Sequence, residues 1–239
     1  MIGFCFLTFD DIERTDIWNE YFKNVSTSEF EIFVNPKNSN LINYNYLFKN
    51  KVIPFPYTNT EWGTFSLLIA QDRLLREAFK NDKIHHFVIL SHNTIPVKKF
   101  KKFRKFLHDK ESVFSYGITN NNDHLVRYEN IKNPRFSKNQ LFCQDQWCIL
   151  SRKDVEILLN GFEEMKDVFG GMFIPDEHVY INYLIYYRNV NNIHNSKFTH
   201  IVWENCSPKV FESVNSWEIS DDCYFLRKVN KNTNINITF

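Results

Sequence analysis

Apolar positions along the chain fall into two patterns, short mainly apolar runs and longer stretches at helical spacing. Short runs rich in Phe, Val and Ile, bounded by polar or turn-forming residues, predict β-strands. Such runs occur at 2–9, 30–34, 52–54, 86–90, 113–116, 147–150, 199–203 and 224–226. The run at 86–90 is almost wholly apolar, which predicts a strand covered on both faces, as in a mainly parallel sheet between helices.

Stretches with apolar residues every three or four positions predict helices. The clearest is 64–79, where five apolar residues lie near helical spacing and three charged residues lie on the other side; they are Leu67, Leu68, Leu74, Leu75 and Phe79, and Arg73, Arg76 and Glu77. Further helices are expected at 97–107, 153–159 and 179–187, and one through Trp18 and Phe22 that Asp10 and Asp11 would cap. Polar connections are expected at 38–50 and 120–138, and a turn at Ser207-Pro208. Strands that alternate with helices predict an α/β domain with a central sheet.

The composition fits a globular domain and excludes several other classes. Of the 239 residues, 43% are hydrophobic and 17% aromatic, which excludes a disordered or low-complexity protein. The 29 basic and 28 acidic residues leave a net charge of +1, without the excess of cations that a nucleic-acid-binding surface needs. We therefore expect no nucleic-acid partner, and any contact with a polyanion must be local.

The cysteines and the N-terminus predict a reducing compartment. The five cysteines are an odd number and include no C-x-x-C pair, which fits reduced thiols better than disulfides or a zinc cluster. The N-terminal apolar run has no basic leader and is too short for a signal peptide or a membrane span. We expect a cytoplasmic protein without a transmembrane anchor.

The loop after the 86–90 strand is the first candidate for ligand binding. In open α/β sheets, ligands bind beyond the carboxyl ends of the strands. No phosphate-binding glycine loop, G-x-S-x-G, H-E-x-x-H or Cys/His metal spacing is present. The loop is Ser91-His92-Asn93, where an enzyme that holds a diphosphate through Mn²⁺ or Mg²⁺ is expected to have carboxylates. If a diphosphate binds there, protein cations must replace the metal.

Two other loops carry charged residues that have two interpretations each. Asp176 and Glu177 open a helix, either as a cap and a first-turn acid favoured by the helix dipole or as a general base. Arg227 and Lys228 follow a strand, either as its solvated end or as a fork and a point charge on a diphosphate.

Two aromatic patterns are better explained by packing than by binding. From Lys98 to Lys105 and on to Leu107, Phe recurs every three or four residues among cations. This predicts an amphipathic helix with Phe inward and Lys outward, and a membrane-surface patch is the less favoured alternative. Trp62, Trp147 and Trp203 could stack on sugar faces, although tryptophans more often pack in a core.

Seven segments, taken in order, resemble one family. They are Phe4-Cys5-Phe6-Leu7-Thr8 with Ile17-Trp18, Glu61-Trp62-Gly63 with Ala70-Gln71-Asp72-Arg73-Leu74-Leu75, Phe87-Val88-Ile89-Leu90-Ser91 with Ile95-Pro96, Asp145-Gln146-Trp147-Cys148, Pro175-Asp176-Glu177-His178, Trp203 to Pro208, and Phe225-Leu226-Arg227-Lys228-Val229. Over about residues 2–230, the chain resembles the core-2/I-branching N-acetylglucosaminyltransferase family, which includes peptide O-xylosyltransferases, and most of all its plant Branch-like relatives.

The resemblance implies a fold, a reaction and residue roles. It implies a GT-A-like nucleotide-sugar transferase fold over residues 1–239, with a donor half at about 1–118 and an acceptor half at about 119–239. It also implies inverting transfer of N-acetylglucosamine, xylose or a similar sugar from a UDP-sugar to a glycan, protein or small-molecule acceptor, with no metal or other cofactor. The implied roles are Glu177 as general base, Asp176 as its orienting neighbour, Arg227 and Lys228 on the diphosphate, Thr8, Asp10, Trp62, Gly63 and Ser91 around the nucleotide, and Gln146, Trp147 and Trp203 near the acceptor.

Departures from the family pattern leave a second function open. Gln144-Asp145 stands where the family has Gly-Ser, Val202 replaces an Asp before Trp203, and Glu204 replaces a Ser. The alternative is therefore a catalytically inactive, sugar-binding or scaffolding relative. The missing anchor, stem and disulfide cysteines of Golgi members favour a cytoplasmic protein of bacterial or viral origin.

Overall fold

Most of the apolar runs form strands of a central sheet, whereas the runs at 199–203 and 224–226 contribute strands to a smaller sheet. The computed structural model describes residues 1–37, 52–54, 59–118, 126–129, 131, 141–187, 192–205 and 207–239. Within these residues, seven strands lie in the order β10-β6-β9-β4-β1-β2-β3. Their bounds are β1 Ile2–Thr8, β2 Phe30–Pro36, β3 Val52–Pro54, β4 His86–Ser91, β6 Val113–Phe114, β9 Ile149–Ser151 and β10 His194–Asn195. β1 to β4 run parallel, whereas β9 is antiparallel to both of its neighbours, so the sheet is mixed.

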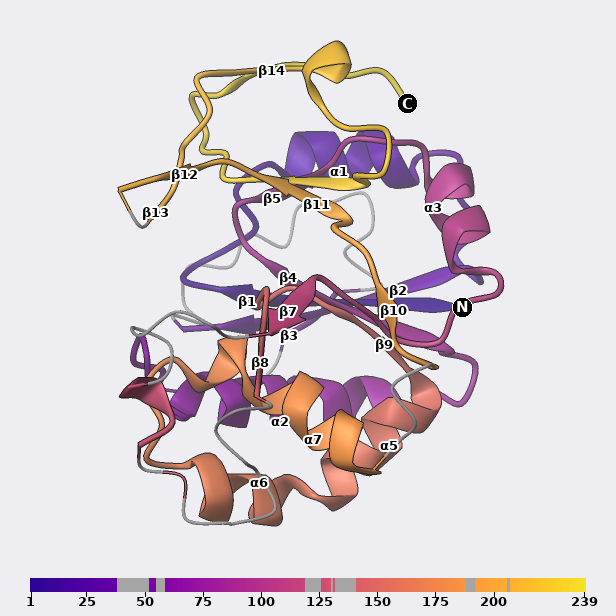
Figure 1. Cartoon of the computed structure of the whole chain (residues 1–239). Coiled ribbons are helices and arrows are strands. Elements are labelled where there is room, and N and C mark those ends of the chain that lie inside the picture. The colour runs from indigo at the N-terminus through magenta and orange to yellow at the C-terminus, as the bar shows by residue number, and fades with distance from the viewer. Residues whose placement is uncertain are drawn as a thin grey trace.

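Helices cover both faces of this sheet, as the apolar runs predicted. Figure 1 shows α2, α5, α6 and α7 on one face and α1 and α3 on the other. The bounds are α1 Thr15–Phe22, α2 Ser66–Phe79, α3 Phe100–Leu107, α5 Arg152–Asn160, α6 Phe162–Phe169 and α7 Val179–Tyr187, with 3-10 turns at Pro175–Glu177 (η4) and Ser216–Glu218 (η6). In β1, Phe4 packs with Trp18 in one core, and the next residue, Cys5, packs with Leu74 in the other. Alternate side chains of one strand thus fill two cores, which explains why the strand has no polar face.

The C-terminal third adds small sheets on the α1 side of the central sheet, with β14 (Ser213–Asn215) above α1 and β11 (Thr199–Ile201) just below it in the view of Figure 1. In the described part of that region, β15 (Phe225–Arg227) pairs parallel with β11 and antiparallel with β5 (Thr94–Pro96). The register places Arg227 opposite Thr94, close to the end of β4. The remaining strands are β7 Tyr116–Ile118, β8 Phe142–Gln144, β12 Trp203–Glu204, β13 Ser207–Pro208 and β16 Asn234–Asn236. A strand distant in sequence therefore carries Arg227 to the edge of the central sheet.

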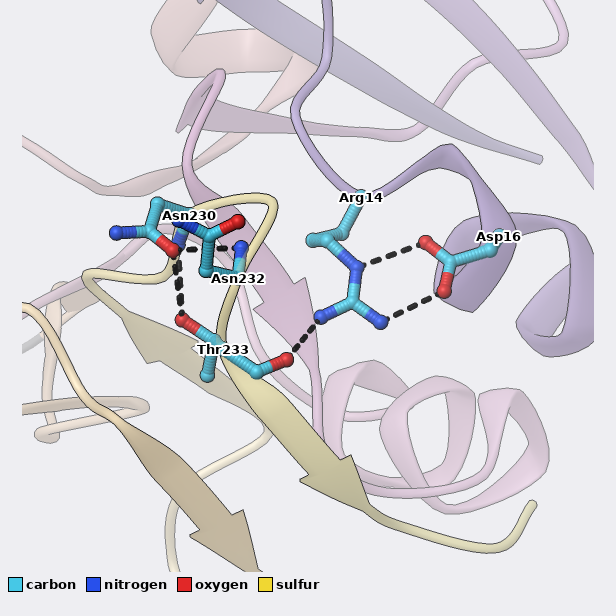
Figure 2. Close-up of polar contacts among 5 residues, drawn as sticks. All are labelled: Arg14, Asp16, Asn230, Asn232 and Thr233. Atoms are coloured by element: carbon cyan, nitrogen blue, oxygen red, sulfur yellow. Dashed lines mark hydrogen bonds and ion pairs between the residues drawn. The ribbon is translucent and has the colours of Figure 1, made fainter.

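Arg14 connects the C-terminal segment to the start of α1 through hydrogen bonds. Figure 2 shows its guanidinium between Asp16 and the backbone of Thr233. Nε and Nη2 donate to the two carboxylate oxygens of Asp16 at 2.9 and 2.7 Å, and Nη1 donates to the Thr233 carbonyl at 2.7 Å. Asn230 accepts from the Asn232 backbone at 2.8 Å and closes the turn that presents this carbonyl. Trp18, one turn into α1, donates to the Thr94 carbonyl at 3.0 Å, so α1 braces β5 as well.

Several predicted boundaries differ from the structure. α1 begins at Thr15 after Arg14, so Asp10 and Asp11 do not cap it; Asp11 accepts a hydrogen bond from the backbone of Ile12 instead. Ser207 and Pro208 form a strand paired with β12, because the turn lies earlier and includes Asn205 at a positive φ of 48°. The helix α6 was not predicted. The expected connections 38–50 and most of 120–138 lie outside the described residues.

The basic stretch has the amphipathic form that its spacing predicted. In α3, Phe100, Phe103 and Leu107 are buried, whereas Lys101 and Lys105 are exposed. The α/β class is likewise confirmed by the helix-covered mixed sheet. Across the described residues, the helices are too short or too polar to pass through a lipid bilayer.

Candidate active site

A cleft of about 990 Å³ opens at the carboxyl ends of the parallel strands. Thr8 ends β1, Asn35 lies near the end of β2, and Ser91 ends β4. The opposite wall comes from segments after β8 and before α7. The lining residues are Leu7, Thr8, Phe9, Asn35, Lys37, Thr60, Trp62, Leu67, Ala70, Ser91, His92, Arg127, Cys143, Gln144, Asp145, Gln146, Trp147, Phe173, Ile174, Asp176, Glu177, Trp203, Ser207, Pro208 and Arg227. This is the place where open α/β sheets bind ligands.

Arg227 is the centre of one polar cluster in the cleft. Its Nη1 donates to the Ser91 hydroxyl and to Asn93 Oδ1, the latter at 2.9 Å. Its guanidinium carbon lies 4.1 Å from the ring centroid of Trp147, and the Trp147 indole donates to the same Ser91 oxygen at 3.1 Å. The ends of β4 and β15 and the segment before β9 therefore fix one guanidinium from three sides.

The electrostatics of this cluster favour an anion. Burial lowers the pKa of Arg227 to about 10, so the group stays charged at neutral pH. Its Nε is buried and has no hydrogen-bond partner in the described structure. Because a buried charged N–H without a partner is costly, the arrangement points to a ligand acceptor. The pKa of His92 is lowered to about 4, mainly by burial and to a smaller extent by the positive charges of Arg227 and Lys228. The neighbouring imidazole is therefore neutral and adds no charge.

Glu177 belongs to a second cluster, on η4. Arg127 Nη1 donates to Glu177 Oε2 at 2.8 Å and contacts His178 Nε2 at 3.2 Å. The side chain of Glu177 is 29% exposed and that of Arg127 is 17% exposed, so the ion pair is half-buried. One carboxylate oxygen is thereby held by a fixed cation, and the carboxylate lines the cleft.

Asp176 differs sharply from its neighbour. It is buried, and burial, followed by the charge of Glu177, raises its pKa to about 7. Its Oδ1 has no hydrogen-bond partner in the described structure. Gln144 holds the local backbone, because its amide donates to the Asp176 carbonyl at 3.4 Å and accepts from Ile181 N at 2.7 Å. The adjacent acids therefore form one paired carboxylate and one buried, partly protonated acid.

A left-handed backbone conformation precedes these acids. Ile174 has φ 53°, which is costly for a β-branched residue. Its N–H donates to the Gly63 carbonyl at 2.9 Å, and Gly63 itself has φ 75°. Phe173 packs so closely on Gly63 that a Cβ there would lie 2.6 Å from its ring. The Trp62-Gly63 turn thus fixes the segment that presents Asp176 and Glu177, although the two lie far apart in sequence.

Most of the residues predicted for the site line the cleft. Thr8, Trp62, Ser91, Gln146, Trp147, Asp176, Glu177, Trp203 and Arg227 are among them. Asp10, Gly63 and Lys228 are not among the lining residues. Asp10 accepts from the Thr8 hydroxyl through its carbonyl at 3.1 Å, and Lys228 pairs through its backbone with Lys209 and Phe211. Trp147, predicted near the acceptor, lies against Arg227, the residue predicted for the diphosphate.

Several lining residues were not predicted from the sequence. Asn35 and Lys37 lie at and just beyond the end of β2, so the rule that ligands bind at carboxyl ends could have identified them. Arg127 lies within the predicted polar connection, where no periodicity or motif distinguishes it. Of the departures from the family pattern, Gln144 has a structural role, and Glu204 pairs with Lys209 at 2.9 Å.

Two cleft-lining residues, Cys143 and Glu177, and the buried His178 beside them combine thiol, carboxylate and imidazole donors. Ligand atoms of Cys143, Glu177 and His178 lie within 4.8 Å of one another. Burial, followed by the charge of Glu177, raises the pKa of Cys143 to about 12, so it is a protonated thiol. Thiol and imidazole do not suit Mg²⁺ or Mn²⁺, which prefer oxygen ligands.

A helix-covered mixed sheet with a buried guanidinium and an ion-paired carboxylate in one cleft has the composition of an α/β enzyme site. The sequence profile of the Core-2/I-Branching enzyme family matches residues 2–225, and the chain belongs to this family. It is 21% identical over 175 residues to "Glycosyltransferase BC10" of Oryza sativa subsp. japonica. The aligned region covers 70% of this chain and 42% of that protein. The chain thus spans about two fifths of that relative's length. A crystal structure of the galactosyltransferase LgtC with donor and acceptor sugar analogues matches at a TM-score of 0.45 and 12% identity, covering 83% of this chain and 75% of that one.

Proposed function

We propose that the chain is an inverting, metal-independent glycosyltransferase that moves a sugar from a UDP-sugar to an acceptor hydroxyl. The observation that carries the proposal is that one cleft contains both a buried guanidinium with an unpartnered N–H, on Arg227, and an ion-paired carboxylate, on Glu177. Membership of the Core-2/I-Branching enzyme family supports the reaction class. The rice relative is named a glycosyltransferase, in agreement with this class.

Arg227 is the group that we assign to the donor diphosphate. Ser91, Asn93 and Trp147 fix its guanidinium, so little reorganisation is needed when negative charge develops on the leaving UDP. Lys228 follows it directly and adds a second cation near the same edge of the sheet. The end of β4 offers Ser91, His92 and Asn93 rather than carboxylates, so protein cations take the role that a divalent ion has elsewhere.

Glu177 is the group that we assign to proton removal. Its carboxylate takes the proton of the acceptor hydroxyl, and the oxygen forms a bond to the anomeric carbon from the face opposite UDP. The bond between the anomeric carbon and the β-phosphate oxygen breaks, and its electron pair leaves with UDP. Arg127 fixes Glu177 through Oε2, while Oε1 makes no hydrogen bond to the described residues. A carboxylate held in this way presents one oxygen to the acceptor.

The remaining lining residues divide between the two substrates. Thr8 and Ser91 lie at the ends of β1 and β4 and line the cleft, and Ser91 accepts from Arg227; both are assigned to the UDP-sugar. Trp62 and Trp203 are 73% and 51% exposed in the cleft, where their broad apolar faces can stack on a sugar. N-acetylglucosamine, xylose or a similar sugar is the donor unit that this family resemblance favours.

The test is a panel of UDP-sugars, scored for binding and for UDP release in the presence and absence of EDTA. The proposal is supported if the wild type releases UDP in the presence of EDTA. It also requires that Glu177→Gln abolishes this release while it still binds UDP. The exposed Glu218 on η6 provides a matched control, since Glu218→Gln should leave turnover unchanged. A requirement for Mn²⁺, or full activity of Glu177→Gln, contradicts the mechanism. If none of the nucleotides raises the melting temperature, the inactive scaffold is favoured instead.

A further inference from the structure

The cluster of Cys143, Glu177 and His178 combines three kinds of zinc ligand. Thiolate, imidazole and carboxylate together suit Zn²⁺, and their ligand atoms already lie within 4.8 Å of one another. In a tetrahedral zinc site, such atoms are about 3.3 to 3.7 Å apart, given the usual bond lengths. A movement of about 1 Å would therefore bring these three side chains to zinc-binding distances.

The hydrogen bonds of His178 prepare one ring nitrogen as a ligand. Nδ1 lies 2.5 Å from the Tyr128 hydroxyl, which donates to the Phe142 carbonyl at 3.1 Å. In this chain of bonds, Nδ1–H donates to Tyr128, and the lone pair of Nε2 points to Arg127. Metal-binding histidines commonly donate their other ring N–H in this way, which fixes the tautomer and the ring orientation.

A positive group already occupies the space between two of the ligands. Arg127 Nη1 lies 2.8 Å from Glu177 Oε2 and 3.2 Å from His178 Nε2. Both are acceptor atoms directed at one cation. A metal ion at this point would have to displace the guanidinium, and it would gain Cys143 as a third ligand.

We propose that Cys143, Glu177 and His178 bind Zn²⁺ in place of the Arg127 guanidinium, and that the bound ion inhibits turnover by occupying Glu177. Binding converts the Cys143 thiol to a thiolate and releases its proton to solvent, and water completes the tetrahedron. The inhibition rests on the proposed role of Glu177 as general base, whereas zinc binding does not. The site is regulatory and leaves the transfer itself independent of metal.

Co²⁺ titration of the whole chain, with a thiol-free reductant, tests the site without reference to activity. We expect a thiolate-to-cobalt charge-transfer band with the visible bands of tetrahedral Co²⁺, and loss of both on adding Zn²⁺. Cys143→Ser should remove the charge-transfer band. Cys223→Ser is the matched control, because Cys223 is also a buried free thiol but lies outside the cleft, and it should retain the band. Arg127→Gln removes the competing cation and should tighten Co²⁺ binding by about tenfold.

The outcomes separate this proposal from the proposed function. Absence of the band in the wild type, or its persistence in Cys143→Ser, overturns the zinc site even when UDP-sugar turnover is robust. A band that depends on Cys143, together with turnover that EDTA restores after Zn²⁺ inhibition, supports both proposals. If Zn²⁺ binds through Cys143 but turnover is unaffected, the inhibitory role is overturned, and Glu177→Gln still decides the assignment of the base. If the chain has no turnover at all, the cobalt spectra still decide the site.

Discussion

The guanidinium carbon of Arg227 lies 4.1 Å from the ring centroid of Trp147, and both side chains donate to the hydroxyl of Ser91. The two residues come from segments far apart in the sequence, since Trp147 precedes β9 of the central sheet and Arg227 ends β15 of the smaller sheet. The stacking holds the planar group in one orientation, and the shared hydroxyl fixes its edge. Trp147 is therefore a positioning residue for the cation that we assign to the diphosphate.

Trp147→Leu removes both the stacking and the indole N–H. Cation–π contacts contribute about 0.5 to 2 kcal/mol, so UDP binding is expected to weaken by about tenfold. Trp147→Phe keeps an aromatic face and should weaken it by only about two- to threefold. Calorimetric titration with UDP measures both, with the exposed Trp217→Leu as control. Affinity unchanged in Trp147→Leu would show that the stacking does not order Arg227.

Asp176→Asn is expected to stabilise the fold most at high pH. Burial raises the pKa of Asp176 from its ordinary value of 3.8 to about 7, so between these pH values the folded state binds the proton and the unfolded state does not. Stability from this group is thus lost as pH rises toward and through 7. Asn stays neutral, and the gain in the free energy of unfolding should be about 2 kcal/mol at pH 8 and smaller at pH 5.

Urea unfolding at the two pH values measures this difference for Asp176→Asn. The exposed Asp167 on α6 provides the control, because Asp167→Asn should change stability little at either pH. An equal effect of Asp176→Asn at pH 5 and pH 8 would contradict a raised pKa for the buried acid.

His92 is expected to make the fold sensitive to acid. Its pKa is lowered from 6.5 to about 4, first by burial and then by Arg227 and Lys228. Between these values the unfolded state takes up a proton that the folded state does not, so stability falls as pH falls from about 6.5 toward 4. The loss from this one group is on the order of 2 kcal/mol.

The free energy of unfolding is measured from pH 7 to pH 4.5 for the wild type and for His92→Gln. The difference between the two isolates the contribution of His92. Other histidines also have lowered pKa values, among them His86 and His200, and the subtraction removes their effect. The exposed His108→Gln serves as control. A pH profile of His92→Gln parallel to that of the wild type would refute the assignment.

The local pattern predicted the strands better than it predicted the site. The apolar run of β4 and the spacing in α2 depend on neighbouring residues, so a sequence shows them directly. α6 was missed although Phe162, Met165 and Val168 recur at helical spacing, because the helix has only eight residues and gives a short pattern. Arg127 could not be identified, because its contact with Glu177 joins positions 50 residues apart and leaves no periodic signal. The candidate positions at strand ends could be predicted from the sequence, because the topology of a parallel sheet alone brings these ends together.

Gly63→Ala tests whether the Trp62-Gly63 turn supports the acids of η4. The turn requires φ 75°, which disfavours any side chain, and a Cβ would lie 2.6 Å from the Phe173 ring. We expect a loss of about 1 to 2 kcal/mol in unfolding free energy and a fall in kcat, because displacing Phe173 moves Ile174 and the acids after it. UDP affinity should change little, since Arg227 is held by other segments. Gly117→Ala is the matched control, as a Cβ there meets nothing within 4 Å. If Gly63→Ala lowered UDP affinity and kcat equally, the turn would act on the donor site rather than on the carboxylates.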